Sequence, residues 1–411
     1  MRVIDSFRRE FSFFKGNYAI IVTSWILIDF AFELPGTYYA LYVLELGATE
    51  TIIGMIGLVE FLALASMQFP GGYLADKFGR KWLISSMTFG VAFCYILYAL
   101  APSWHFILIG AVLLGLVSIY DPAVNAIVAD SLPPERRGMG YGLIMLIVSA
   151  TTTPGPFLAG ILYNEFGLVQ GMRIGYGLVV VLWLFAAFLR LRLKETIANT
   201  RKPSLNELLH AYPIALKESL RVWKKVPRSM FYLLLSFVSF HLGWAAVQRY
   251  LVVYAVQELS IDEVVWPLIL TALFVTMIVL AVPMGKVVDR FNRKIPLLLS
   301  YLTAMVALWL FVTGDLLRLF FSLAIFGVAI VMIDSAYSAL EADLTPKEHR
   351  GKVTGFRYFS AYIMMAIGNL VGGMLFEHFS PQLPFFLAII FFIPSFILTL
   401  TMVHEPEKRE E

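Results

Sequence analysis

Residues 71–82 read GGYLADKFGRKW, and residues 283–294 read PMGKVVDRFNRK. Both stretches place an acid, a base and a phenylalanine in the same order between long apolar runs, with the acids 213 residues apart. The same offset relates Asp121 to Asp334 elsewhere in the chain. A constant offset in separate segments indicates an internal duplication, so the sequence predicts two similar halves.

The composition is that of a membrane protein. Hydrophobic residues form 59% of the 411 residues and charged residues only 15%, compared with about 25% charged residues in soluble proteins. Apolar runs of about 20 residues recur along the chain, and each is long enough to cross roughly 30 Å of hydrocarbon. The sequence therefore predicts an all-α membrane protein. The single cysteine, Cys94, excludes a disulfide within the chain and a cysteine-based metal site.

Hydropathy predicts twelve membrane-spanning helices, most of them joined by short loops. We expect two six-helix bundles related by a pseudo-twofold axis along the membrane normal. The predicted domains are an N-terminal bundle (1–192), a cytoplasmic amphipathic linker (193–228) and a C-terminal bundle (229–411). The predicted spans cover residues 18–44, 50–75, 81–101, 104–130, 137–163, 171–192, 229–257, 263–285, 294–313, 317–342, 350–376 and 383–403.

The distribution of basic residues predicts the orientation. Lys and Arg gather in the N-terminal arm, in the loops after even-numbered spans and in the C-terminal tail, whereas Arg173 and Arg318 fall on the opposite side. Because cytoplasmic loops carry the excess of Lys and Arg, both termini are expected in the cytoplasm, in a multi-pass protein of the plasma membrane. The net charge of +3 then reflects one membrane face and does not indicate a nucleic-acid partner.

The first charged stretch also carries a family resemblance. Residues 72–81, GYLADKFGRK, resemble the signature loop G-x-x-x-D-R/K-x-G-R-R/K between helices two and three of the major facilitator superfamily. Asn292 replaces the second glycine in the later copy, and DSLPPERRG at 130–138 resembles the family at the end of helix four. The resemblance covers the whole chain. It implies alternating access, in which two bundles rock around a central site.

The charges of these loops are predicted to form a conformational latch. Asp76 is expected at the C-terminal end of a helix, where the dipole is already negative, so it needs a cation such as Arg80. The alternative is that these residues serve only topology and a tight turn. The predicted latch comprises Gly72, Asp76, Gly79, Arg80, Asp130, Gly285, Asp289, Arg293 and Asp343.

Ionisable residues inside the predicted spans are costly and are therefore functional candidates. Asp29 and Glu33 lie four residues apart on one helix face, and two adjacent carboxylates can hold and release a proton. The alternative is structural hydrogen bonding to a neighbouring helix. The predicted substrate or proton pathway comprises Asp29, Glu33, Asp121, Asn125, His241, Trp244, Gln248, Arg249, Asp334, Tyr337, Glu341 and Arg357.

Two arginines inside spans should each meet a carboxylate, because arginine stays charged. Glu60 and Gln68 are weaker candidates for function, since a polar contact between helices explains them equally well. The candidate partners of Arg249 and Arg357 are Asp29, Glu33, Asp121, Asp334 and Glu341, with Asp76 as a further candidate for Arg357.

Residues 150–160, ATTTPGPFLAG, carry Gly155, Pro156 and Gly160. They resemble the antiporter motif G-x(3)-G-P-x-x-G-G of drug–proton exchangers, with departures at Thr151 and Ala159. A packing kink without meaning for direction is the alternative. The exporters' arginine in span four is absent, so proton coupling would have to use other groups.

The leading prediction is a proton-coupled exporter of hydrophobic or amphipathic organic compounds, acting as a monomer on a small molecule and protons within the lipid bilayer. The alternative is an importer or exchanger of a polar metabolite such as a sugar or organic ion. A non-transporting sensor on the same fold is a remote third possibility. We predict no catalytic residues, metal or cofactor, because the sequence has no nucleotide-binding loop, metal-ligand cluster or nucleophile motif.

Overall fold

The computed structural model describes five long segments of the chain and five single positions between two of them. Every regular element within these residues is a helix. The described residues are 14–133, 137–197, 225–290, 292–346 and 349–405, with Pro213, Leu216, Lys217, Arg221 and Trp223. The predicted amphipathic helix of the linker falls largely outside them.

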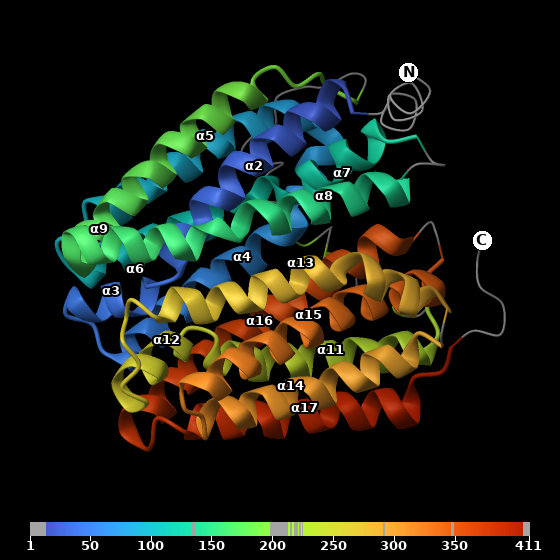
Figure 1. Ribbon diagram of the computed structural model, residues 1–411. Coiled ribbons are helices and arrows are strands. Elements are labelled where there is room, and N and C mark those ends of the chain that lie inside the picture. Colours follow the sequence, from blue (N-terminus) through green and yellow to red (C-terminus); the bar gives the residue numbers. More distant parts are fainter. Residues whose placement is uncertain are drawn as a thin grey trace, which may run out of the picture.

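The helices fall into two groups that follow the two halves of the chain. Figure 1 shows α2 to α9 on one side of the molecule and α11 to α17 on the other, and α4 packs closely along α16 where the groups meet. The first group is α2 (Gly16–Gly36), α3 (Tyr39–Glu45), α4 (Glu50–Phe78), α5 (Arg80–Ala99), α6 (Trp104–Val117), the 3₁₀ turn η1 (Ser118–Tyr120), α7 (Asp121–Ser131), α8 (Arg137–Thr152) and α9 (Pro154–Arg190). The second group is α11 (Arg228–Val247), α12 (Leu251–Val253), the π-helical turn η3 (Tyr254–Glu258), α13 (Trp266–Arg290), α14 (Lys294–Val312), α15 (Leu316–Leu344), α16 (Arg350–His378) and α17 (Leu383–Met402).

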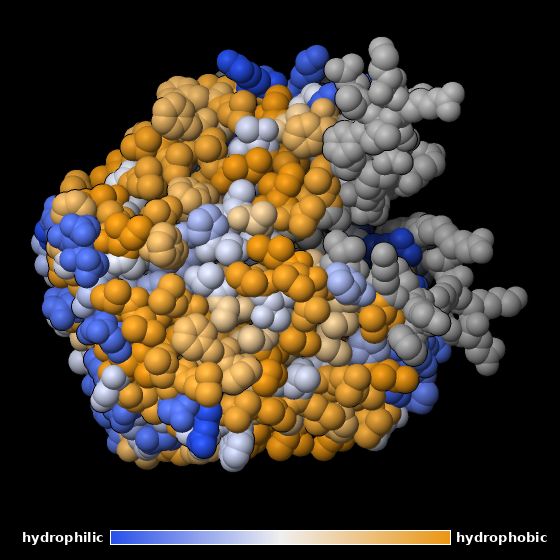
Figure 2. Space-filling view, viewed as in Figure 1, coloured by the Kyte–Doolittle hydropathy of each residue, from blue (hydrophilic) through white to orange (hydrophobic). Residues whose placement is uncertain are grey.

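The long helices run between two ends of the molecule, which we name by residues. At the Arg80 face α4 ends and α5 begins, and α15 ends shortly before α16 begins. At the Tyr38 face α2 ends and α4 begins. Figure 2 shows hydrophobic residues covering much of the flank between these ends, with hydrophilic residues gathered toward the ends.

The length and apolar character of the helices fit a bilayer. Among the described residues, ten helices are long and apolar enough to cross a membrane, and the apolar segment Trp266–Ala281 is shorter. Large apolar side chains such as Phe93, Phe185 and Phe321 point outward, as expected where lipid is the solvent. The chain is therefore an all-helical, multi-pass membrane protein over the residues that the structure describes.

Prolines and glycines interrupt the helices at specific places. Pro35 lies at the end of α2, and the chain restarts as α3 at Tyr39, so the predicted span 18–44 is broken in its last third. A 3₁₀ turn precedes α7, and Pro122 occupies the first turn of α7, where its missing N–H leaves no helical bond unmade. Both breaks lie beside residues predicted to function.

Gly167 reverses the chain within α9. Its φ of +71° is non-helical, and it lies between the predicted spans 137–163 and 171–192. A Cβ on Gly171 would meet the backbone oxygen of Leu162 at 2.8 Å, a closeness that a continuous helix does not allow across nine residues. The two parts of α9 therefore pack against each other around Gly167.

The conformation of Gly167 predicts a stability effect with a matched control. Gly167→Ala should lower the free energy of unfolding by about 1 to 3 kcal/mol, because this backbone region is essentially restricted to glycine. No atom lies within 4 Å of a Cβ added there, so a loss of stability would come from the backbone conformation and not from a steric clash. Gly177, which is helical and equally open, should tolerate alanine or gain up to about 1 kcal/mol. Thermal unfolding in detergent measures both, and equal effects would contradict the assignment.

Candidate functional site

A cavity of about 960 Å³ lies between the two halves. Its lining comes from α2, the second half of α4, η1 and α7 on one side, and from the first four turns of α16 on the other. These segments all lie toward the Arg80 face. The lining residues include Trp25, Gln68, Gly72, Tyr73, Lys77, Tyr120, Asp121, Asn125, Arg350, Lys352, Thr354, Tyr358 and Tyr362.

The N-terminal half supplies the acidic part of this wall. Asp121 and Asn125, two residues of the predicted pathway, line the cavity one turn apart on α7, beside Tyr120. Asp29 lies one turn beyond Trp25 on α2. Its Oδ2 atom is buried and has no hydrogen-bond partner among the described residues. Neither Asp29 nor Glu33 lines the cavity itself.

The C-terminal half places an ion pair directly behind its wall. Arg357 Nη1 lies 3.1 Å from Glu341 Oε2, and the Thr354 hydroxyl donates a hydrogen bond to Glu341 Oε1. The Arg357 guanidinium also lies 4.6 Å from the ring centre of Tyr358 and 5.0 Å from that of Tyr337. Glu341 is therefore the partner of Arg357, one of the candidates from the sequence.

Arg249 has a partner outside the candidates that the sequence offers. Its Nη2 atom lies 2.6 Å from Glu60 Oε2 on α4, and its Nε atom donates to Asn369 Oδ1 on α16 at 2.8 Å. The expectation that Arg249 pairs with one of the acids of spans one, four or ten is wrong. Helix spacing within one half cannot reveal this contact, because Glu60 and Arg249 come from different halves.

The other predicted residues of the C-terminal half occupy different settings. His241 Nδ1 donates a hydrogen bond to the Phe237 carbonyl at 2.8 Å, and its ring centre lies 3.9 Å from that of the tilted Phe237 ring. Trp244 stacks on Phe326 with ring centres 4.6 Å apart. Asp334 is exposed and interacts electrostatically with Arg357. None of these three lines the cavity.

The two charged loops form matching ion pairs at the Arg80 face. Arg80 Nη1 donates to Asp130 Oδ2, and Arg293 Nη1 donates to Asp343 Oδ2 at the equivalent place of the repeat. Gly79, with a φ of +104°, allows the turn between α4 and α5. Gly72 lines the cavity. Four positions of the predicted latch are thus paired, whereas the side chains of Asp76 and Asp289, and the surroundings of Gly285, fall outside the described part of the structure.

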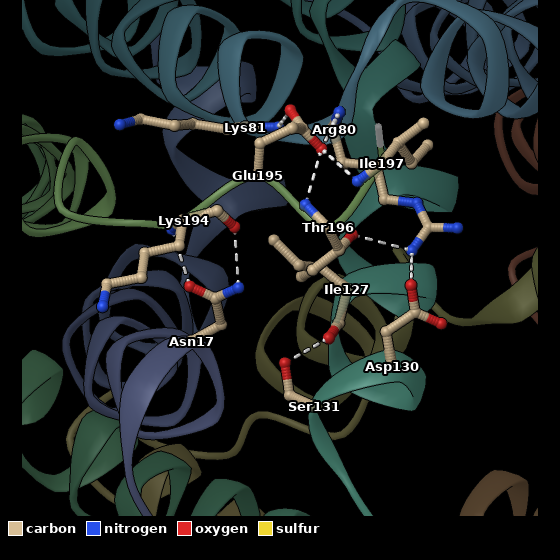
Figure 3. Close-up of polar contacts among 10 residues, drawn as sticks. All are labelled: Asn17, Arg80, Lys81, Ile127, Asp130, Ser131, Lys194, Glu195, Thr196 and Ile197. Carbon is tan, nitrogen blue, oxygen red and sulfur yellow. Dashed lines mark hydrogen bonds and ion pairs between the residues drawn. The ribbon is translucent and has the colours of Figure 1, made fainter. Parts of the chain in front are cut away.

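Glu195 belongs to this charged cluster and was missed by sequence reasoning. Figure 3 shows its carboxylate accepting backbone N–H bonds from Arg80 (3.1 Å), Lys81 (3.0 Å), Thr196 (2.9 Å) and Ile197 (3.3 Å). Burial alone would raise the pKa of Glu195, but these four donors outweigh it and hold the pKa below its usual value. The signal in the sequence that could have revealed Glu195 is an acid placed shortly after the last helix of the N-terminal half.

The repeat carries a comparable cap. After α17, Glu405 Oε1 accepts the backbone N–H of Lys294 at 2.7 Å, at the start of α14. In each half, an acid that follows the sixth predicted span therefore caps the helix that follows the charged loop. The carboxylates satisfy orphan donors at a helix start, where negative charge is favourable.

Arg190 is a second residue that the sequence hides. Its side chain is only 1% exposed, and it donates from Nε to Ser24 Oγ and from Nη1 to Thr88 Oγ1, both at 2.9 Å. It lies 5.6 Å from the ring centre of Tyr120, on the cavity wall. The sequence FAAFLRLRLK reads as basic residues at a helix end, so nothing in it marks the first arginine as buried.

The antiporter-like segment joins three helices. A Cβ on Gly155 would lie 2.8 Å from Glu33 Cβ on α2, and one on Gly160 would lie 3.1 Å from Pro267 on α13 of the other half. Pro156 is buried between them. The small residues allow close helix approach at this point.

A cavity between two duplicated helical halves, with matched charged loops at one end, is an arrangement typical of transport proteins. The family model of the Major Facilitator Superfamily matches residues 21–268 and 233–411. The chain therefore belongs to the Major Facilitator Superfamily.

Individual relatives are more distant. The chain is 29% identical over 211 residues to multidrug resistance protein MdtG of Citrobacter koseri, in a match that covers 46% of the chain and spans only about half of the relative's length, 51%. It is 25% identical over 366 residues to an uncharacterized MFS-type transporter of Methanocaldococcus jannaschii, covering 88% and 91% of the two chains. A crystal structure of the nucleoside transporter NupG matches with a TM-score of 0.68 at 16% identity, over 93% of this chain and 98% of that one, which shows the fold alone.

The cap formed by Glu195 predicts a pH-dependent contribution to stability. Glu195→Gln should lower the free energy of unfolding by about 1 kcal/mol at neutral pH, because a neutral amide is a weaker acceptor for four N–H groups. The folded-state pKa is depressed, so this contribution is present above the usual value of 4.5 and disappears as the pH falls below it. Chemical unfolding of both proteins at several pH values measures it.

Glu165→Gln is the matched control, because Glu165 is an exposed acid whose side chain makes no hydrogen bond or ion pair with the described residues. It should change stability little at any pH. A difference between Glu195→Gln and the unaltered protein that persists unchanged at pH 3 would contradict the role assigned to the carboxylate.

Proposed function

We propose that the chain is a proton-coupled transporter of the plasma membrane that exports hydrophobic or amphipathic organic compounds by alternating access. The observation that supports this proposal most directly is the set of residues on the cavity wall. The rings of Trp25, Tyr120, Tyr358 and Tyr362 line the cavity together with Asp121, the one acid among the described lining residues. Aromatic faces accept apolar surfaces of many shapes and attract cations, and a carboxylate favours a cationic group.

The membrane arrangement follows the duplicated halves. Twelve spans in two six-helix bundles result if α8 and the part of α9 before Gly167 form one span, and the part of α9 after Gly167 forms another. The broken helices α2–α3, α6–α7 and α11–η3 then each supply one span. We assign the Arg80 face, and both termini, to the cytoplasm, and the basic residues of that face support this assignment. The cavity then takes up its substrate from the cytoplasmic side, and a monomer suffices because both walls come from one chain.

Proton coupling is assigned to the acids of α2 and α7. Asp29 and Asp121 both interact electrostatically with the buried Arg190. One positive charge therefore stands opposite two acids and can neutralise only one of them. One acid is neutralised by Arg190, and the other is stabilised when it binds either a proton or a cationic substrate. Competition between proton and substrate for that site is what exchange requires. Glu33, packed beside Gly155, extends the proton path toward the Tyr38 face.

The charged loops act as a latch at the cytoplasmic face. The Arg80–Asp130 and Arg293–Asp343 pairs each fix the loop of one half, and Asp76 and Asp289 are assigned to the same clusters. The latch holds each bundle rigid while the two bundles move relative to each other. The similarity to MdtG, a multidrug resistance protein, supports the exporter.

A second candidate is an importer or exchanger of a polar metabolite. It is favoured by the amides of Gln68 and Asn125 and the hydroxyl of Thr354 on the cavity wall, which suit a hydroxylated substrate, and by the likeness to a nucleoside transporter. A non-transporting sensor has less support, because it needs no cavity of this size.

Purified protein in proteoliposomes with an imposed pH gradient decides between these candidates. A panel of cationic dyes and polar metabolites is offered on the cytoplasmic side. Gradient-driven movement of dyes out of that side supports the exporter, whereas counterflow of one metabolite supports the second candidate. No movement of any compound under any gradient would contradict transport.

Loss of either acid should uncouple transport from the gradient. Asp29→Asn and Asp121→Asn should each abolish uphill dye transport, because an amide cannot take up and release the proton. Dye binding should persist in Asp29→Asn, whose side chain lies off the cavity wall, and weaken in Asp121→Asn. Glu165→Gln is the control, because it removes one exposed acid from the same protein without touching Asp29 or Asp121. Uphill transport at the original rate in both asparagine variants would remove these acids from the mechanism.

A further inference from the structure

An ion pair joins the two halves on the side of the cavity that faces the Tyr38 face. Arg249 follows α11 in the C-terminal half, and Glu60 lies on α4 in the N-terminal half, with Nη2 and Oε2 2.6 Å apart. The Arg80–Asp130, Arg293–Asp343 and Arg357–Glu341 pairs each lie within one half. Rocking of the halves would leave those three pairs intact but would separate Arg249 from Glu60.

Neighbouring groups hold this pair in place. Asn369 is fully buried. Its Oδ1 accepts the Arg249 Nε–H, while its Nδ2 donates to the Met365 carbonyl at 2.8 Å, which fixes the orientation of the amide. The ring of Tyr39 lies 5.0 Å from the Arg249 guanidinium. The two charged side chains are 13% and 24% exposed, so both are largely withdrawn from solvent.

The pair lies where the cavity ends. Glu60 is two turns before Gln68 on the same face of α4, and Gln68 lines the cavity. Phe61 packs against Tyr362, another lining residue, with ring centres 5.9 Å apart. The Arg249–Glu60 pair is therefore one layer beyond the lining, on the side of the Tyr38 face.

Beyond this layer the two halves are in direct contact. Tyr38 donates to the Glu263 carbonyl at 2.6 Å, and the Trp266 indole donates to the Thr37 carbonyl at 3.2 Å. Glu377, near the end of α16, accepts the backbone N–H of Thr51 at the start of α4 at 2.9 Å. These bonds close the molecule at the Tyr38 face.

The helices that carry these contacts approach too closely for a path between them. A Cβ on Gly54 would lie 2.5 Å from the Asn369 carbonyl oxygen, and one on Gly57 would lie 2.7 Å from the Asn369 side chain. A Cβ on Gly373 would lie 2.4 Å from the Glu50 carbonyl oxygen. Glycine is required at such approaches because any side chain would force the backbones apart.

We propose that Glu60 and Arg249, positioned by Asn369, form a clasp that closes the cavity toward the Tyr38 face and must separate before the cavity can open there. The proposal rests on alternating access in the proposed function, but on neither the substrate nor the coupling ion. Removing one charge leaves the other without a partner in a poorly hydrated site, which is unfavourable in the closed form. Water that enters the opened form hydrates the remaining charge, so loss of one partner shifts the population toward opening.

Labelling of a cysteine on the cavity wall measures this opening. The parent is Cys94→Ser with Asn125→Cys, since Asn125 is exposed on the wall. A membrane-impermeant maleimide is added to proteoliposomes from the Tyr38 face alone. Labelling of the parent should be slow, and Glu60→Gln or Arg249→Gln should raise its rate roughly tenfold through the population shift. Exchanging the charges, Glu60→Arg with Arg249→Glu, should restore slow labelling.

The controls separate opening from unfolding and from general charge effects. Arg318→Gln removes a cation whose contacts lie within the C-terminal half, so it should leave labelling slow. Cys94 is buried, and its reactivity in a chain that retains it reports unfolding. If either glutamine variant unfolds by this measure, Asn369→Ala, which loosens Arg249 without leaving an unpaired charge, takes its place and should also speed labelling.

Unchanged labelling in the folded clasp variants, or fast labelling in the charge-exchanged protein, would overturn the proposal. The readout uses no substrate and no proton gradient. A failure here therefore contradicts the clasp alone, whereas a failure of gradient-driven dye efflux contradicts the proposed function alone.

Discussion

A charge buried in a membrane protein needs a partner, and the rest of this structure depends on how that constraint is met. Arg357 meets Glu341 within one half, whereas Arg249 meets Glu60 across the two halves. The second arrangement ties the segment just after α11 to α4 and, through Asn369, to α16. It brings the glycine-rich faces of α4 and α16 together, and this contact separates the cavity from the Tyr38 face.

The duplication explains the Arg80 face but not this closure. Arg80–Asp130 and Arg293–Asp343 occupy equivalent places of the repeat, and Glu195 and Glu405 cap the helices that follow. At the same offset, however, Glu60 corresponds to Leu273 and Arg249 to Gly36. Each half thus keeps a similar fixed loop at one end, whereas the contact between the halves is asymmetric and occurs once.

This asymmetry shows which features the sequence could predict. Apolar runs and basic loops specify where helices lie, and the repeated loop indicates the family, because these signals are local or recur at a fixed offset. The partner of Arg249 could not be predicted, since it depends on how two separately folded halves meet. Arg190 and Glu195 were missed for a related reason: one looks like a basic helix end, and the other caps a helix more than 110 residues away in sequence.

Direct measurement of protons during substrate binding tests the central claim, that Asp121 and its neighbours exchange a proton for a cationic organic compound. Purified protein in a weakly buffered detergent solution is mixed with a cationic dye, and a soluble pH indicator reports protons released. Proton release should saturate together with dye binding and should be absent from Asp121→Asn. Saturable dye binding to the unaltered protein with no proton release across the pH range from 5 to 8 would contradict it.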